Sequence, residues 1–570
     1  MYSNLIFFSS TCSAYSANAV LSIRSLCLFS YFYSEETRKY IATFLIHSRK
    51  PSAPALQKQK TMTSHIPRKM SSRERKKLTD ALLGLFTLDF QPFTLVEGTA
   101  FREFIYHLNP NYVLPSKKMI SSTLIPRQYV QRKTVMMAEV AKYAKAVSLT
   151  VESWTSIKNY SYLAVTAHFF KEEEDKLVLK SVLLHCESFD EQDTSAAELA
   201  SSLTQITEDW GIADKISFAV SESATNIVEA FKLKGWPFYG CYALKFNLIV
   251  QNSLRPVESI VSKVSRIVTD FKMSEEAKEA LFSYQSDIHN ITRPLNVKKC
   301  DITRWNSVFR MLERFSHLRE AIEASYDFIP EASVITTEEW EIIKQLCTVL
   351  KPFEEAATKM CDKKYPTASM AIGLTNGLKC ICEHLKQEGF PEVVLQVLQH
   401  LQNGLEMHYG NIENEPALAL CVYLDPRFKE SFIEDPSIVF QTRLNINEQI
   451  NKEISASLLV PPTPNYSIWA EFDLMYAKSQ AVSAEQELDL FNKEPILDRS
   501  SCPVEWWQSH RYRYPHLYKI FKENCHIVAT SISCERMFSK SGYVLSDRRS
   551  RISTKRTSEL IFLNANEETE

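Results

Sequence analysis

An acidic residue near the end of the chain stands among apolar residues. Glu535 lies between Ile532 and Phe538 and follows the stretch Ala529-Thr530-Ser531. A solvated surface charge is seldom placed in this way, so the pattern indicates a carboxylate held in a packed wall. Metal-dependent phosphoryl transfer needs carboxylates held in place in this manner. This segment therefore makes phosphoryl transfer the first chemistry to test against the rest of the chain.

A basic run follows this carboxylate. From Arg536 to Arg556 the chain carries seven Lys or Arg residues against one acid, Asp547. Such a run can line a phosphate backbone, or it can be the solvated face of a helix, and the sequence leaves both interpretations open. The residues predicted to contact DNA in this run are Arg548, Arg549 and Arg551.

The elements that would position these groups can be predicted from hydrophobic periodicity. Residues 162–170 alternate as a strand does, and 146–151, 177–184 and 216–220 are further β-rich runs. Residues 152–156 are predicted to form a turn and 239–241 a short edge strand, while 194–210 and 225–233 have helical spacing. Three antiparallel strands, a helix, a parallel strand, a helix and a short strand is the order of an RNase H-like α/β core.

In a fold of this order, carboxylates can converge from the end of the first strand, the end of the fourth strand and the final helix. Those places hold Glu152, Glu222 and Glu535. A two-metal site needs its carboxylates to hold two ions about 3.5–4 Å apart. The alternative is that Glu152 and Glu222 are structural residues at strand ends.

Along the chain, five segments are predicted. They are a disordered extension with a basic linker (1–77), a helical N-terminal domain (78–144), the first part of the core (145–254), a helical insertion domain (255–500) and a C-terminal region that completes the core (501–566). The apolar runs in the first 35 residues are interrupted too often for a membrane span. The clustered basic residues of this extension form a solvated linker, a nuclear-import signal or a phosphate-binding arm. They are Arg68, Lys69, Arg73, Arg75, Lys76 and Lys77.

Composition narrows the class of protein. The net charge is -2, so any contact with nucleic acid must come from local basic patches. The 13 cysteines include no Cys-x-x-Cys, which is typical of reduced thiols in a cytosolic or nuclear protein. Cys380, Cys382 and His384 would point to different faces of a helix, so no metal site is predicted there.

Several motifs resemble recurrent segments of the hAT-family transposases, and most of all their domesticated relatives of the zinc-finger BED type. The resemblance covers roughly residues 75 to 566. It is carried by Thr150-x-Glu152-x-Trp154-Thr155-Ser156, Ser221-Glu222-Ser223-x-x-Asn226, Thr303-Arg304-Trp305-Asn306-Ser307, Leu424-Asp425-Pro426-Arg427-x-Lys429, Trp506-Trp507, Tyr514-Pro515-x-Leu517 and the segment around Glu535.

The departures from the family pattern are informative. The family's first two catalytic positions are Asp, and here they are Glu152 and Glu222. Each added methylene lengthens the side chain by about 1.5 Å, whereas Mg²⁺ demands near-octahedral geometry. The family's Cys-x-x-His pair is here Cys241 with Leu244, and no Cys-x-x-Cys followed by spaced histidines supplies a BED finger.

The resemblance also implies two binding regions. Arg304 and Trp305 would lie near a DNA end, where an indole can stack on an unpaired base; alternatively Trp305 is a core residue. An aromatic cluster would either be buried in the chain or anchor a homodimer through its C-terminal region. The residues predicted for dimerisation are Trp506, Trp507, Leu517, Phe521 and Phe538.

We therefore expect an α/β fold and a catalytically inactive, transposase-derived nuclear protein. It would homodimerise and associate with DNA or chromatin, as a transcriptional regulator, with no cofactor, membrane or small-molecule partner. The alternative is an active transposase that holds Mg²⁺ with Glu152, Glu222 and Glu535. The resemblance to BED-type relatives also implies a SUMO ligase-like activity, for which the sequence offers no residue.

Overall fold

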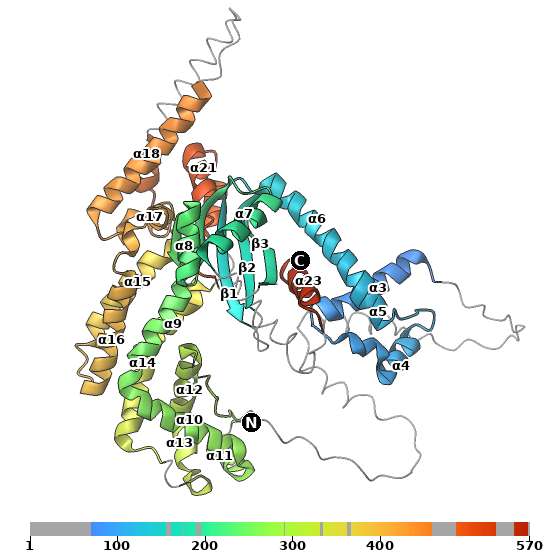
Figure 1. Cartoon of the computed structure of the whole chain (residues 1–570). Helices are drawn as coiled ribbons and strands as arrows, with labels where there is room; N and C mark the ends of the chain where they lie inside the picture. The colour runs from blue at the N-terminus through green and yellow to red at the C-terminus, as the bar shows by residue number, and fades with distance from the viewer. Residues whose placement is uncertain are drawn as a thin grey trace, which may run out of the picture. The chain divides into compact units, whose positions relative to one another are not determined.

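The computed structural model describes the chain in ten stretches and divides it into two compact units, residues 1–117 and 118–570. Each unit is described by itself below (Figure 1). Among the described residues, no helix combines the length and apolarity needed to cross a bilayer. The described residues are 70–155, 161–174, 176–189, 195–289, 291–301, 303–330, 334–361, 366–458, 486–531 and 552–567.

The first unit is helical, as its periodicity predicts. Helix α3 begins at a capping box, in which the Ser71 side chain accepts from the Glu74 backbone N–H and the Glu74 carboxylate reaches back to the cap. Its buried face packs through Phe86 on Phe93, with ring centroids 5.4 Å apart. The elements of this unit are α3 (Ser72–Thr87), the short 3₁₀ helix Phe93–Glu97 and α4 (Thr99–Leu108).

The second unit contains a five-stranded mixed sheet in the order β3-β2-β1-β4-β5. The first three strands are antiparallel neighbours, and β4 and β5 run parallel to β1, as the sequence predicts. The strands are β1 (Val147–Thr155), β2 (Ser161–Glu173), β3 (Lys176–Phe189), β4 (Ile216–Ser221) and β5 (Phe238–Gly240). The turn predicted at 152–156 is wrong, because β1 keeps pairing with β2 as far as Thr155 opposite Ser161.

Both faces of the sheet are covered. Alternation along β1 sends Leu149 and Val151 into one core with α6, α7 and α8. The opposite core contains Phe218 and Val220 of β4 together with α9. Helix α8 ends at Gly235, whose φ of 65° is the left-handed conformation that favours glycine. The covering helices are α6 (Ile125–Tyr143), α7 (Ala196–Asp209), α8 (Thr225–Lys234) and α9 (Tyr242–Ser253).

After α9 the described residues up to 458 form helices and no strand. Buried apolar residues recur along each of them, and Thr336 and Glu339 form the capping box that begins the longest, α14. These helices are α10 (Glu258–Met273), α11 (Glu275–Asp287), α12 (Trp305–His317), α13 (Arg319–Glu323), α14 (Thr337–Met360), α15 (Ala368–Leu385), α16 (Glu392–Tyr409), α17 (Pro416–Tyr423) and α18 (Pro436–Leu458).

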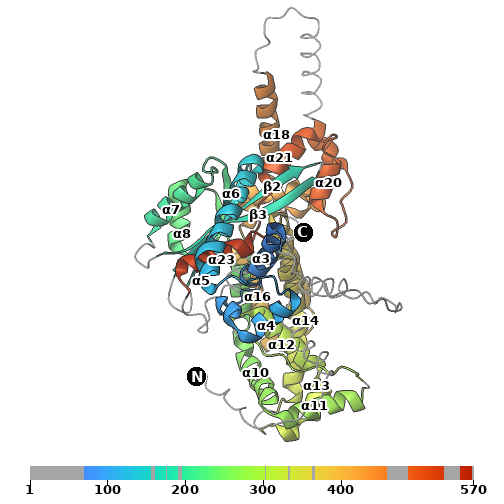
Figure 2. The same ribbon diagram turned by 90° about the vertical axis from the view of Figure 1, so that its right-hand side faces the viewer.

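The C-terminal helices return to the sheet (Figure 2). Phe521 of α21 stacks on Phe170 of β2, with ring centroids 5.3 Å apart. Helix α23 covers the edge strand β3, where the Asn566 side chain accepts from the Leu183 backbone N–H and donates to its carbonyl, both at 2.9 Å. This pairing occupies backbone groups that an edge strand would otherwise expose. The helices are α20 (Pro503–Ser509), α21 (Pro515–Asn524) and α23 (Thr554–Ala565).

Candidate functional site

Glu152 lies in β1, opposite Ala164 of β2. It shares a strand face with Thr150, because successive side chains of a strand point to opposite faces. Only 4% of Glu152 is exposed. The side chain is therefore enclosed by the protein and is not displayed at a solvent-open edge.

Glu222 follows directly after β4, whose Ser221 is paired in parallel with Val151 of β1. Glu152 and Glu222 are each one residue beyond this pair, so the sheet brings them to neighbouring positions. One carboxylate oxygen of Glu222, Oε1, accepts from the Ser153 backbone N–H at 3.0 Å and also from the Ser153 hydroxyl. The Glu222 carboxylate is thus engaged in holding the ends of β1 and β4 together.

The third predicted carboxylate, Glu535, lies outside the described residues, as do Phe538, Arg548, Arg549 and Arg551. The described chain leading toward Glu535 passes the end of β5. There the Tyr242 backbone N–H donates to the Ala529 carbonyl at 2.9 Å, and the Ser531 N–H donates to the Cys241 sulfur at 3.4 Å. Burial raises the pKa of the Cys241 thiol to about 11.

Lys245 is a cation at this end of the sheet that the sequence did not single out. Its ammonium lies over the Tyr239 ring, 4.0 Å from the centroid. Burial lowers the Lys245 pKa from its ordinary value. The lysine passes so close to Gly240 that a Cβ there would meet Lys245 Cε at 2.6 Å and Ser223 Oγ at 2.9 Å. Glycine is therefore needed at position 240 for the lysine to occupy this place.

Two buried histidines in this unit were also not singled out from the sequence. The ring of His168 lies between the hydroxyls of Thr150 (3.0 Å from Nε2) and Ser181 (2.8 Å from Nδ1). His526, beyond α21, lies with its Nε2 3.0 Å from the Ser217 hydroxyl of β4. Desolvation lowers the pKa of His168 to about 3 and that of His526 to about 4, so both rings are neutral at pH 7. His168 connects three strands of the sheet, whereas His526 connects the sheet to the C-terminal segment, and neither is placed as a proton donor to solvent.

Of the two adjacent residues predicted to contact DNA, one is exposed and the other is buried. Arg304 is exposed at the start of α12, whereas Trp305 is only 3% exposed. The Trp305 ring packs edge-on against Phe246 of α9, with centroids 5.9 Å apart. The indole is therefore occupied by the core, which was the alternative interpretation of its helical spacing.

The predicted dimerisation residues pack largely within the chain. Trp507 stacks on Phe521 with centroids 5.4 Å apart, and its indole N–H donates to the Leu424 carbonyl at 2.7 Å. Leu517 is buried beside them, whereas Trp506 is partly exposed. These buried side chains can support an interface from beneath, but they offer little surface of their own to a partner.

The Asp-Pro-Arg-x-Lys motif joins the helical region to the C-terminal region. Asp425 and Arg427 form a buried bidentate pair, with bonds of 2.9 and 2.7 Å. Lys429 is also buried, and its ammonium donates to the Phe491 carbonyl at 2.6 Å and the Glu494 carbonyl at 2.5 Å. Those carbonyls belong to the end of a helix described over residues 486–493, so a cation there also complements the helix dipole.

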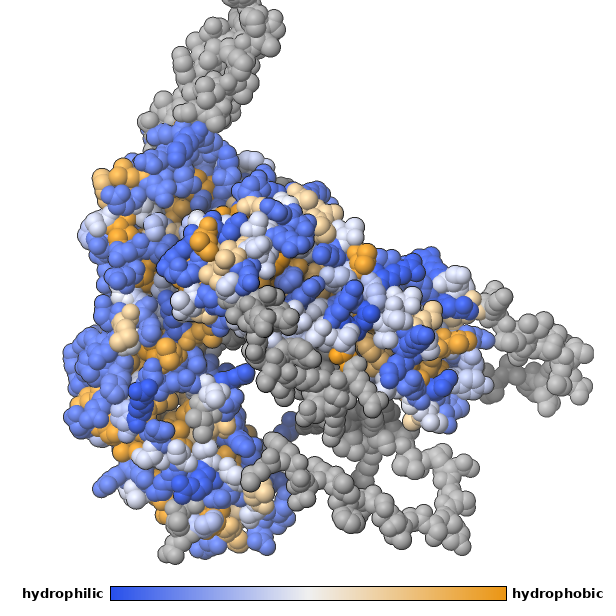
Figure 3. All heavy atoms as spheres, viewed as in Figure 1, coloured by the Kyte–Doolittle hydropathy of each residue, from blue (hydrophilic) through white to orange (hydrophobic). Residues whose placement is uncertain are grey.

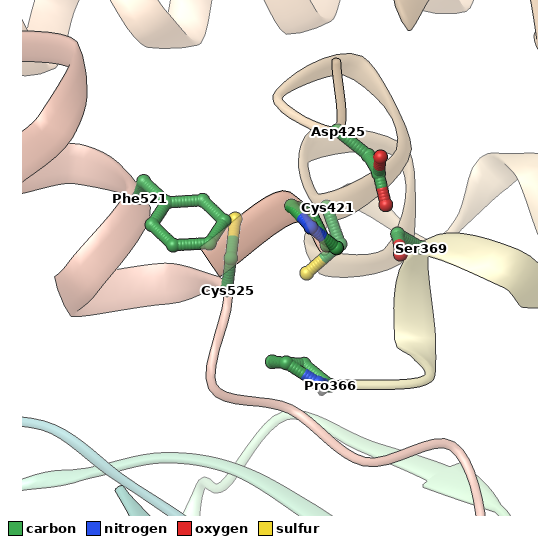
Figure 4. A pocket seen from close by; sticks show the side chains of 7 residues that line it. Pro366, Ser369, Cys421, Asp425, Phe521 and Cys525 are labelled. Atoms are coloured by element: carbon green, nitrogen blue, oxygen red, sulfur yellow. The ribbon is translucent and has the colours of Figure 1, made fainter. Parts of the chain in front are cut away.

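A small cavity of about 10 Å³ lies beside this motif, enough for a single water molecule. The Cys421 and Cys525 side chains face it from α17 and from the end of α21 (Figure 4). It is too small for a substrate. Its lining residues are Pro366, Ser369, Cys421, Asp425, Pro503, Phe521 and Cys525.

Three segments of the chain match known families. Residues 150–234 match the ZBED1 RNase-like domain, and residues 239–349 match the ZBED1 RNase-like helical domain. Residues 487–567 match the hAT family C-terminal dimerisation region. The sheet, the first helices after it and the C-terminal segment are thus each similar to a recorded family.

The relatives that align with most of the chain share little sequence identity with it. The human "Zinc finger BED domain-containing protein 4" is 24% identical over 86% of this chain and 43% of the relative. The maize "Putative AC transposase" is 23% identical over 82% of this chain and 62% of the relative. The Talaromyces stipitatus "Putative transcriptional regulator tpeD" is 21% identical over 85% of this chain and 61% of the relative. The chain thus spans less than two thirds of each of these relatives.

Proposed function

This chain is a hAT-transposase-derived protein, and from that premise we propose that it is a catalytically inactive nuclear protein. It homodimerises through its C-terminal region and associates with DNA or chromatin as a transcriptional regulator. In this proposal the fold is an RNase H-like core that a helical insertion, predicted at 255–500, interrupts and the C-terminal region completes.

The observation that carries the inactive state is the arrangement of Glu152 and Glu222. A metal pair needs carboxylate oxygens that are free to converge on the ions at about 2.0–2.1 Å. Glu222 instead commits Oε1 to the backbone and hydroxyl of Ser153, and Glu152 is enclosed in the sheet. This engagement of Glu222 and the burial of Glu152 support the inactive state, and we derive no cleavage step through a Mg²⁺ pair.

Dimerisation is supported by the match of residues 487–567 to a dimerisation region. Regulation is suggested by the name of the fungal relative, and nuclear location by the names of the relatives together. Association with DNA is supported by exposed cations such as Arg304, because a protein with a net charge of -2 must bind nucleic acid through local patches.

A cleavage assay tests the inactive state. A labelled terminal-repeat DNA duplex is incubated with the full chain and either Mg²⁺ or Mn²⁺, and we expect no product above that of a chain-free control. Turnover that Glu535→Gln abolishes would overturn the proposal in favour of an active Glu/Glu/Glu transposase. Sedimentation of the full chain tests dimerisation, and a monomer at every concentration would refute it.

A further inference from the structure

A basic loop joins α11 to α12, in the lower part of Figure 1. We define the basic loop as residues 291–301 with Thr303 and Arg304, the described part of this connection. It carries four cations against one acid, Asp301. All four cations are exposed. They are Arg293, Lys298, Lys299 and Arg304.

The backbone of the basic loop is held in place by its own buried residues and by α11. Val297 and Cys300 are buried on either side of the two lysines. The Gln285 side chain, itself buried, donates to the Leu295 carbonyl at 3.0 Å and accepts from the Leu295 N–H at 2.8 Å. Arg314 of α12 donates to the Asn296 carbonyl at 3.0 Å. The loop is therefore built to present its cations outward from a fixed backbone.

The cations of the basic loop lack strong acidic partners. Within the described part of the chain, no ion pair involves Arg293, Lys298 or Lys299, and Arg304 comes only within 3.8 Å of Asp301. The Asp301 carboxylate is itself engaged, since it accepts from the Thr303 N–H and hydroxyl at 3.1 and 2.7 Å.

Some cations on neighbouring helices are paired. Lys263 of α10 lies 2.6 Å from the Glu339 carboxylate. Arg310 of α12 lies 3.4 Å from that of Glu354. The positive charge of the basic loop is thus available to an external anion, whereas part of that of the neighbouring helices is compensated.

The place of the loop connects it to the candidate site. The Gln251 side chain of α9 donates to the Thr303 carbonyl, and the Trp305 N–H lies 3.4 Å from Asn247 Oδ1. Helix α9 begins directly after β5, at the strand end beside Glu222. The basic loop therefore lies along the helix that leads away from the two carboxylates.

We propose that the basic loop binds the phosphodiester backbone of nucleic acid without reading its sequence. Fixed lysine and arginine side chains neutralise phosphates and release counterions, which favours a polyanion. A protein partner would need a buried apolar anchor, and the large exposed apolar residues of the described chain include none from this loop. The inference deepens the proposed function, on which it rests, by naming a surface that contacts DNA.

The test uses the full chain and a fluorescent 30-base-pair duplex DNA of arbitrary sequence. The double variant Lys298→Gln, Lys299→Gln is compared with a control of equal charge change, Lys272→Gln, Lys344→Gln, whose lysines are exposed on α10 and α14. The affinity is measured at salt concentrations between about 50 and 200 mM. Each phosphate contact contributes about 0.9 to the slope of log affinity against log salt.

We expect the loop variant to lose about 1.8 from that slope, and the control to keep the wild-type value. Over a fourfold change in salt, the wild type then loses about tenfold more affinity than the loop variant. Equal slopes for the two double variants would overturn the role of the loop while leaving DNA association intact. A wild type that binds no duplex at all would overturn both.

A duplex RNA of the same length tests whether the basic loop binds the phosphates of DNA or those of RNA. DNA binding that depends on the two lysines, with RNA bound no better, supports a chromatin-facing surface. Lysine-dependent binding that strongly favours RNA supports the phosphate-binding loop but contradicts the DNA association on which the proposed function depends.

Discussion

The carboxylate of Glu487, a residue of the helix 486–493, caps the N-terminus of helix α21 at His516. Glu487 Oε2 accepts from the backbone N–H groups of His516 at 3.2 Å and Leu517 at 3.1 Å. Its Oε1 lies 2.8 Å from the Nδ1 atom of the His516 ring. A buried anion at a helix N-terminus satisfies N–H groups that the helix itself cannot. This contact fixes α21, which carries Leu517 and Phe521, against the helix 486–493.

Replacing Glu487 with Gln should weaken this junction. The amide can accept fewer strong hydrogen bonds and loses the charge, so we expect a loss of about 1.5–3 kcal/mol in the free energy of unfolding. Urea denaturation of the full chain measures it. Glu505→Gln is the matched control, because Glu505 is exposed on α20. Equal stability of both variants would show that the cap is not needed.

The same contact should make stability depend on pH. The hydrogen bond that the His516 ring donates to the Glu487 carboxylate raises the His516 pKa above its ordinary value of 6.5. The stabilisation is fully present below pH 6.5 and is lost as the pH rises through the higher pKa of the folded chain. The difference in unfolding free energy between wild type and His516→Gln should therefore shrink as the pH rises from 6 to about 9. A difference that grows over this range would refute the assignment.

The buried histidines should make the stability of the fold depend on pH in the opposite direction. Because the pKa of His168 is lowered to about 3, the fold favours its neutral ring. Stability should then fall as the pH drops below 6.5, by up to about 1.4 kcal/mol per pH unit for this one proton. We expect His168→Gln to reduce the slope of unfolding free energy against pH between 6 and 4. An unchanged slope would indicate that His168 already carries its proton in the fold.

How much of this could be predicted depends on whether the determining contacts are local. The succession of strands and helices along 146–241 follows from periodicity, and the structure confirms it. The end of β1 was missed, since Glu152 to Thr155 lacks apolar alternation and its strand pairing comes from β2. The neighbouring positions of Glu152 and Glu222 followed from topology alone, because parallel strands end at the same edge of a sheet.

Contacts between distant segments could not be foreseen. A histidine in the strand run around His168 gives no sign that Thr150 and Ser181 will satisfy both of its nitrogens. Likewise, the spacing of Trp305 is compatible with the core and with a base-stacking surface, and only the placement of α9 decides between them. Of the basic loop, only Arg304 was predicted to contact DNA, because the charges of its other residues become meaningful only once their missing acidic partners are known.

We expect Lys429 to stabilise the fold, although it belongs to the Asp-Pro-Arg-x-Lys motif that resembles a recurrent hAT-family segment. Its ammonium donates to two carbonyls at the end of the helix 486–493. Lys429→Met removes both hydrogen bonds, and a hydrogen bond to a charged group contributes about 1.5–3 kcal/mol. Lys493→Met, at an exposed position of the same helix, is the control. We expect only Lys429→Met to lower the urea midpoint, and no difference between the two would refute the interaction.

Trp507 and its neighbour Trp506 should respond differently to truncation. Trp507 is fully buried, so Trp507→Ala should cost about 3–5 kcal/mol of unfolding free energy through the cavity it leaves. Trp506 is only partly buried, and its ring stacks on His510 at 4.0 Å, so its removal should cost less. Chemical denaturation measures both losses.

Sedimentation of the same two variants then separates packing from dimerisation. Trp506→Ala, if this ring contacts the partner, shifts the chain from dimer toward monomer while the fold survives. Trp507→Ala should weaken the dimer only in proportion to its loss of stability, because this side chain has no surface to offer. A Trp507→Ala chain that keeps wild-type stability yet runs as a monomer would show instead that the indole reaches the partner, and that the C-terminal region repacks when the dimer forms.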